Sequence, residues 1–122
     1  MARILIVDDS IYMRQVLGKI LKAAGHHVVG EADSAESAYQ QMTKLQPDLI
    51  TLDLVMPGEG GLGLLVRLDG QKDRPKVIVV SAVGQEQQIE TALGLGAADF
   101  IVKPFDAGTI QQTIAGLVAP TA

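Results

Sequence analysis

The segment "ILIVDDS" (residues 4–10) joins a hydrophobic run to a pair of acids. Ile4–Val7 are four strongly apolar residues, and Asp8 and Asp9 follow them directly. Such a continuous aliphatic run is typical of a strand covered on both faces, as in a parallel sheet. Two adjacent acids at the end of such a strand have two interpretations that this segment leaves open. They form a turn that precedes a helix, or they bind a cation.

Four more runs along the chain are predicted to be strands. Three are as apolar as the first, and the fourth is more polar, which places it at an edge of the sheet. The three apolar runs are Leu49–Leu52, Val77–Val80 and Phe100–Val102, and the more polar run is His27–Gly30.

Stretches with apolar residues three and four positions apart alternate with these strands and predict helices. Ser10 and Ser34 stand where they can cap the first two helices. The alternation predicts an α/β fold, (βα)5, in which one parallel sheet lies between helices over a single domain, residues 1–122. The predicted inner faces are Val16, Leu17, Ile20, Leu21 and Ala24 in the first helix; Ala35, Ala38, Met42 and Leu45 in the second; Leu62, Leu65 and Val66 in the third; Ile89, Ala92 and Leu93 in the fourth; and Ile110, Ile114, Leu117 and Val118 in the fifth.

The composition excludes several classes of function. The net charge of -4 disfavours direct binding to nucleic acid or to an anionic membrane. There is no cysteine for a disulfide or a thiolate metal site. The sequence has neither a secretory signal nor an apolar run long enough to cross a bilayer, so we expect a cytoplasmic protein.

Polar side chains follow four of the predicted strands. They are Asp8 and Asp9, Asp53, Ser81, and Lys103. Each alone has an ordinary explanation as a turn, a cap or a solvated lysine. Because the carboxyl ends of parallel strands meet at one edge of the sheet, we expect these side chains to converge there as a site.

The charges at this edge predict a divalent cation. Two carboxylates about 4 Å apart repel each other by roughly 4 kcal/mol at an effective dielectric constant near 20. Three carboxylates against one lysine leave an excess of negative charge, and oxygen ligands favour Mg²⁺, with Mn²⁺ as the alternative. A carboxylate beside Mg²⁺ and a lysine can accept a phosphoryl group.

The motifs "VDDS", "TLDLVMPG", "VVSA" and "FIVKPF" together resemble the receiver domain of two-component response regulators, especially single-domain chemotaxis proteins of the CheY type. The resemblance implies a flavodoxin-like, doubly wound sheet with strand order 2-1-3-4-5. It also implies that Asp53 is the phosphoacceptor. Asp9 would ligate Mg²⁺ directly and Asp8 through water, with Asp53 and the backbone carbonyl of Val55 as further ligands.

The same resemblance assigns the remaining motif residues. Lys103 would contact the phosphoryl oxygens, and the peptide before Pro104 is expected to be cis. Ser81 would be the switch hydroxyl and Phe100 the switch aromatic residue. Val55 and Val83 are apolar where many relatives carry amides or acids that orient water, so we expect slow self-dephosphorylation.

The implied function is a phosphorylation switch and not a conventional enzyme. A sensor histidine kinase, a phosphotransfer protein or a small donor would phosphorylate Asp53. Phosphorylation would change the affinity of the face formed by the fourth helix, fifth strand and fifth helix for an output protein, in the chemotaxis type a flagellar motor switch protein. We expect a monomer, and dimerisation on phosphorylation stays open.

Three alternatives remain. In the first, the chain is a receiver cut from a longer regulator, such as a transcription factor or hybrid kinase. In the second, it is a Mg²⁺-dependent phosphohydrolase with an aspartate nucleophile, although that chemistry uses an acid at the position of Val55. In the third, it is a degenerate receiver that serves as a constitutive scaffold.

Overall fold

Strands and helices alternate along the whole described chain. The computed structural model describes residues 1–118, so residues 119–122 of the predicted domain lie outside it. The elements are β1 (Arg3–Val7), α1 (Ile11–Ala23), β2 (His27–Ala32), α2 (Ala35–Leu45), β3 (Leu49–Asp53), α3 (Gly60–Leu68), β4 (Lys76–Ala82), α4 (Glu86–Gly94), β5 (Asp99–Lys103) and α5 (Ala107–Leu117).

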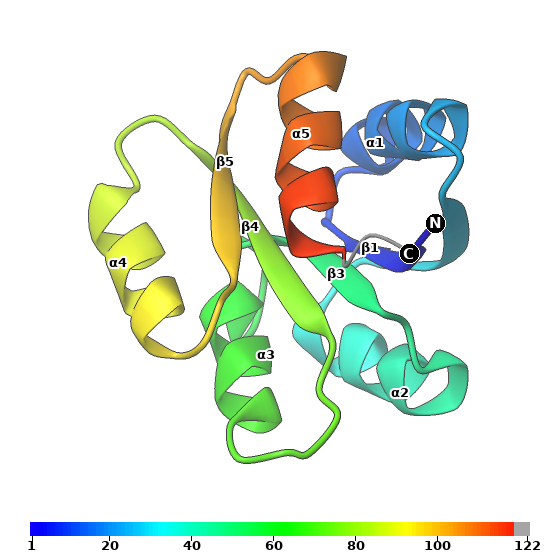
Figure 1. Cartoon of the computed structure of the whole chain (residues 1–122). Helices are drawn as coiled ribbons and strands as arrows, with labels where there is room; N and C mark the ends of the chain where they lie inside the picture. Colours follow the sequence, from blue (N-terminus) through cyan, green and yellow to red (C-terminus); the bar gives the residue numbers. More distant parts are fainter. Residues whose placement is uncertain (119–122) are drawn as a thin grey trace.

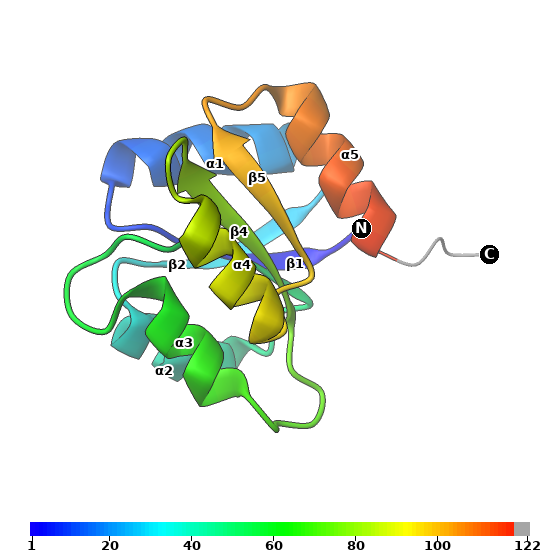
Figure 2. The same ribbon diagram turned by 90° about the vertical axis from the view of Figure 1, so that its left-hand side faces the viewer.

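The five strands form one parallel sheet in the order β2-β1-β3-β4-β5. This confirms the predicted fold class and strand order, and the more polar β2 lies at an edge. Helices α1 and α5 cover one face of the sheet, while α2, α3 and α4 cover the other (Figures 1 and 2). The carboxyl ends of all five strands therefore meet at one edge.

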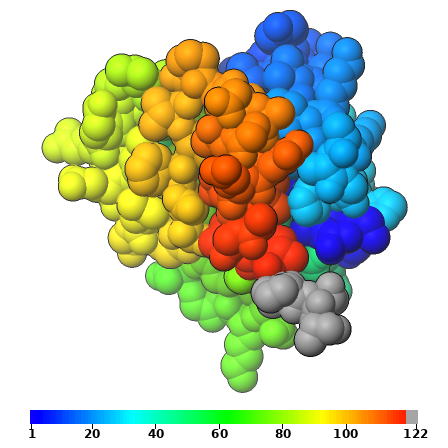
Figure 3. Space-filling view, turned by 45° about the horizontal axis from the view of Figure 1, so that its top comes forward, coloured from blue at the N-terminus to red at the C-terminus, as the bar shows by residue number. Residues whose placement is uncertain are grey.

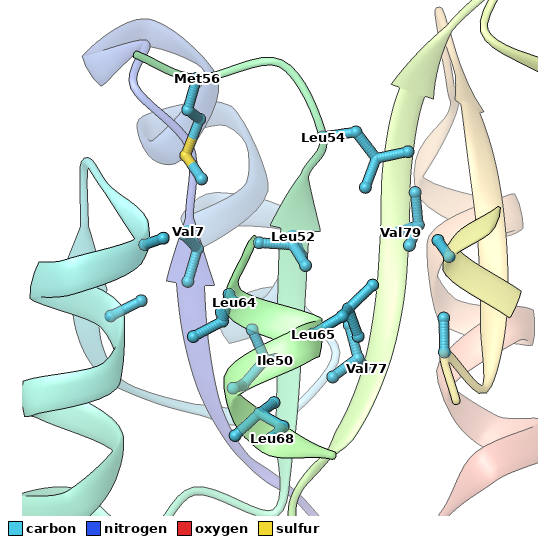
Figure 4. Close-up of a cluster of buried hydrophobic side chains, with 14 of the residues drawn as sticks. Val7, Ile50, Leu52, Leu54, Met56, Leu64, Leu65, Leu68, Val77 and Val79 are labelled. Carbon is cyan, nitrogen blue, oxygen red and sulfur yellow. The ribbon is translucent and has the colours of Figure 1, made fainter. Parts of the chain in front are cut away.

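The core has one layer on each face because alternate residues of a strand point in opposite directions. In β1, Ile4 and Ile6 pack with the buried residues of α1 and α5, whereas Leu5 and Val7 pack with those of α2 and α3. Figure 4 shows the second layer, in which side chains of α3 pack against the strands. Its labelled residues are Val7, Ile50, Leu52, Leu54, Met56, Leu64, Leu65, Leu68, Val77 and Val79.

The prediction of the inner helix faces is wrong for two residues. Val66 in α3 is 58% exposed and Leu93 in α4 is 40% exposed. In each case a neighbouring apolar residue, Leu65 or Ala92, takes the buried position, since adjacent residues lie about 100° apart around a helix. The buried residues of α3 are Gly60, Gly61, Leu64, Leu65 and Leu68.

The predicted caps of the first two helices are confirmed. Ser10 Oγ accepts a hydrogen bond from the Met13 N–H at 3.2 Å, and Ser34 Oγ accepts one from the Ser37 N–H at 3.1 Å. The turn interpretation of residues 4–10 is therefore correct for Ser10. Within residues 1–118, no helix combines the length and the hydropathy that a bilayer span requires.

Candidate functional site

Three carboxylates converge where β1 and β3 end side by side. Val7 pairs with Leu52 in the sheet, so the residues that follow them lie together. One carboxylate oxygen each of Asp8, Asp9 and Asp53 lies within 4.8 Å of the others. Asp8 is 2% and Asp53 7% exposed, whereas Asp9 is exposed. We call this group the acidic pocket.

Asp8 is held at every polar atom. Its N–H donates to the Ala32 carbonyl at 3.0 Å, and its Oδ1 accepts from the Ser10 N–H at 2.8 Å. Its carbonyl oxygen accepts a hydrogen bond from Nη1 of Arg14. Its Oδ2 lies 3.5 Å from Nζ of Lys103. The Asp8 backbone is thus fixed by contacts to β2 and α1, and its side chain contacts Lys103 of β5.

Asp53, the last residue of β3, is a buried acid whose pKa is raised. Its Oδ1 accepts a hydrogen bond from the Val55 N–H at 3.1 Å, and its Oδ2 lies 4.0 Å from Nζ of Lys103. Burial, with smaller contributions from the charges of Asp8 and Asp9, raises its pKa to about 6, although the Val55 N–H and the charge of Lys103 lower it. The metal-free pocket therefore resists holding three negative charges.

Glycines allow α3 to begin directly against this carboxylate. A Cβ on Gly61 would collide with the carbonyl oxygen of Asp53. Gly60, at the start of the helix, has φ of 69°, which side chains rarely tolerate. The glycines after "MP" therefore set how closely α3 approaches the end of β3.

The donor atoms of the acidic pocket fit a hard divalent cation. All three side chains offer carboxylate oxygens, which Mg²⁺, Mn²⁺ and Ca²⁺ bind and which zinc uses less often than nitrogen or sulfur. The sequence has no cysteine, and both histidines, His26 and His27, lie at the opposite edge where β2 begins. The cluster is thus able to hold a metal ion.

Ser81 and Lys103 lie at the same edge, whereas Phe100 lies near the start of β5. Ser81, the next-to-last residue of β4, is fully buried, and within residues 1–118 its hydroxyl has no hydrogen-bond partner. Phe100 in β5 is 42% exposed. The Lys103–Pro104 peptide is cis, as the resemblance implied. Asp53, Ser81 and Lys103 thus lie at the carboxyl ends of their strands, whereas Asp8 and Asp9 lie in the loop directly after β1.

A model of the response regulator receiver domain family matches residues 4–115. The chain belongs to this family.

Single-domain and multidomain proteins both appear among the relatives of this receiver. It is 38% identical over 112 residues to the chemotaxis protein CheY of Thermotoga maritima, covering 92% of this chain and 93% of that protein. It is 44% identical over 104 residues to protein-glutamate methylesterase/protein-glutamine glutaminase 5 of Myxococcus xanthus, of which it covers 30%.

A solved relative carries a metal and a fluoride group. The CheX–CheY–BeF3–Mg²⁺ complex of Borrelia burgdorferi matches the receiver with a TM-score of 0.87 and 32% identity, covering 96% of this chain and 90% of that one.

Three features of the receiver were missed at the level of sequence. Arg14 contacts the backbone of the acidic pocket. A basic residue near the start of a helix is a usable signal, because the helix dipole disfavours a cation there. Thr51, two residues before Asp53, has a buried hydroxyl without a partner among the described residues. Only its polarity within an apolar strand could have indicated this.

The third feature is that Ile11 and Tyr12 join Val55 and Val83 as exposed apolar residues at the edge of the sheet that carries the acidic pocket, a set that we call the apolar rim. Ile11 and Tyr12 begin α1, while Val55 and Val83 lie just after β3 and β4. All four side chains are at least 58% exposed, with Val83 at 74%. Large exposed apolar side chains that gather beside a polar site mark a surface that a protein partner can cover.

Proposed function

We propose that this receiver is a phosphorylation-activated switch in which Asp53 accepts a phosphoryl group. The observation that carries the proposal is the convergence of Asp8, Asp9 and Asp53 within 4.8 Å, with Lys103 at ion-pair distance from two of them. An Asp53 oxygen would form a bond to phosphorus as the bond to the donor nitrogen of a phosphohistidine breaks, and the freed imidazole takes up a proton.

The chain's own residues orient the acceptor. The Val55 N–H holds Oδ1 of Asp53 and fixes the rotation of the carboxylate. Lys103, already between Asp8 and Asp53, would move its charge onto the oxygens of the incoming phosphoryl group. Asp8, Asp9, Asp53 and the Val55 carbonyl would hold Mg²⁺. When bound, this ion neutralises charge that builds on the phosphoryl oxygens during transfer.

Ser81 supports a switch more strongly than a static scaffold. A fully buried hydroxyl without a partner is costly, and in residues 1–118 Ser81 has none. A phosphoryl oxygen on Asp53 would offer the acceptor that this hydroxyl lacks. Its movement would open space into which the half-exposed ring of Phe100 turns. The two states differ by a hydrogen bond and a ring position.

The output surface would be the face formed by α4, β5 and α5. Figure 3 shows α5 and β5 next to each other on one surface, with α4 beyond β5. Leu93, Phe100 and Val102 supply exposed apolar groups on α4 and β5, at 40%, 42% and 37%. Since several relatives are chemotaxis proteins, we propose a chemotaxis-type output protein, such as a flagellar motor switch component.

The donor would be a protein, a sensor histidine kinase or a phosphotransfer protein. The apolar rim of Ile11, Tyr12, Val55 and Val83 lies at the same edge of the sheet as the acceptor and would be covered in such a complex. A small phosphodonor would leave it in water. The receiver would catalyse only its own phosphorylation and dephosphorylation.

Beryllofluoride, a phosphoryl mimic, tests this function. We expect the ¹H–¹⁵N spectrum of the wild-type protein with Mg²⁺ to change at Asp53, Ser81 and Phe100 when beryllofluoride is added. Asp53→Asn should show no such change. A wild-type spectrum that stays the same would contradict the switch and favour the constitutive scaffold.

A further inference from the structure

Arg14 joins α1 to the ends of β1 and β2. Its Nη1 donates to the carbonyl oxygen of Asp8 at 2.5 Å, and its Nε donates to Oε1 of Glu31 at 3.0 Å. The Arg14 side chain is 15% exposed and that of Glu31 is 48% exposed. A planar guanidinium that meets two acceptors in its fork has a defined orientation.

We propose that Arg14 is a positioning residue for metal binding at the acidic pocket. By holding the Asp8 carbonyl, it fixes the peptide that joins Asp8 to Asp9, and with it the direction of the Asp9 side chain. The inference rests on the proposed function, because a fixed Asp9 matters for binding the cation.

Asp9 depends on this peptide more than its neighbour does. Asp8 is oriented through its own carboxylate, by the Ser10 N–H and by Lys103. Asp9 is exposed, and within residues 1–118 no hydrogen bond holds its carboxylate. The orientation of the Asp8–Asp9 peptide therefore sets where this carboxylate can reach, and groups that hold metal ligands from outside tune metal affinity.

Charge alone predicts the opposite effect. A free cation beside the acidic pocket would repel Mg²⁺, and its removal would tighten binding. Glu31 pairs with Arg14 at 3.0 Å and offsets part of its charge, so we expect the hydrogen bond to the Asp8 carbonyl to be the larger contribution. A substitution that removes the guanidinium thus separates positioning from electrostatics by the sign of its effect.

The test measures Mg²⁺ affinity by calorimetry and by amide shifts, in Arg14→Met, Arg14→Lys and Glu31→Gln. The matched control is Arg74→Met, because Arg74 also donates to backbone carbonyls, those of Leu95 and Gly96, but before β4 at the far edge of the sheet. We expect Arg14→Met to weaken Mg²⁺ binding about tenfold, with Arg14→Lys in between and Arg74→Met within about twofold of wild type.

A second readout needs no metal. The Asp9 amide resonance of the metal-free protein should shift or broaden in Arg14→Met and stay unchanged in Arg74→Met. Lower melting temperature with unaltered affinity and an unaltered Asp9 resonance would mean a merely structural role and would overturn the inference. So would tighter binding of Mg²⁺ by Arg14→Met.

Failure of the proposed function and failure of this inference give different results. Wild-type protein that binds neither Mg²⁺ nor beryllofluoride overturns the proposed function and this inference with it. Wild-type protein that binds both, alongside an Arg14→Met variant that behaves like the control, overturns only the role of Arg14. If Arg14→Met does not fold, Arg14→Lys and Glu31→Gln decide, and wild-type affinity in both overturns the inference.

Discussion

Nζ of Lys103 lies 4.0 Å from Oδ2 of Asp53, so this cation contacts the buried carboxylate without a close hydrogen bond. The attraction lowers the pKa of Asp53, but burial and the neighbouring acids raise it more, to about 6. The metal-free protein is therefore destabilised when Asp53 is ionised. Stability and metal binding are linked through this one group.

The first prediction concerns the pH dependence of stability. Between about pH 4 and about pH 6, the folded protein binds more protons at Asp53 than the unfolded chain, so the free energy of unfolding falls as pH rises. At neutral pH, Asp53→Asn should raise that free energy by on the order of 3 kcal/mol in the absence of metal. Urea unfolding at several pH values measures both effects.

The matched control is Asp69→Asn, which removes an exposed acid at the end of α3, away from the pocket. It should change neither the stability nor its slope with pH. Asp53→Asn with wild-type stability at neutral pH would show that the acidic pocket is not strained by charge.

The second prediction is that Mg²⁺ stabilises the protein and that protons compete with it. A ligand at a hundredfold excess over its Kd adds about 2.7 kcal/mol if it binds only the folded state. At about pH 7.5 the melting temperature should rise with Mg²⁺, and at about pH 5.5 it should rise less, since Asp53 is then largely protonated.

Thermal unfolding at matched ionic strength, with KCl replacing MgCl2, separates binding from screening. An equal rise in melting temperature at both pH values would contradict competition with the Asp53 proton. No rise at either value would contradict metal binding.

How far the sequence predicts this protein depends on the range of each interaction. Asp8, Asp9 and Asp53 could be placed together because parallel strands bring their carboxyl ends to one edge, whatever the side chains do. The Arg14 contact could not, since it depends on the rotamer of a long side chain. Val66 was misplaced because two adjacent apolar residues fit a 3.6-residue period equally well. The metal-site and switch roles remain predictions.

The third prediction concerns the two buried hydroxyls that lack partners in residues 1–118, those of Thr51 and Ser81. Thr51→Val keeps the shape and removes the unsatisfied group, so the free energy of unfolding should rise by about 1 kcal/mol. The control is Thr113→Val, because the Thr113 hydroxyl donates to the Thr109 carbonyl at 2.8 Å. If chemical unfolding gives Thr51→Val a lower free energy of unfolding than wild type, the Thr51 hydroxyl has a hydrogen-bond partner in solution.

Ser81→Ala is expected to separate stability from switching. It should stabilise the unphosphorylated protein for the same reason as Thr51→Val, while beryllofluoride no longer changes the resonances of Phe100. A Phe100 response equal to that of wild type would exclude Ser81 as the link between Asp53 and the ring.

The last prediction concerns the lifetime of phosphorylated Asp53. Val55 is 58% exposed beside Asp53 and offers no polar atom on its side chain to orient an attacking water. Val55→Asn supplies an amide at this position, so the acyl phosphate should hydrolyse faster. The decay of phosphorylated protein after removal of the donor measures the rate. Val66→Asn is a close control, because Val66 is also 58% exposed but lies on α3 outside the apolar rim. An unchanged or longer lifetime in Val55→Asn would mean that access of water, and not its orientation, limits hydrolysis.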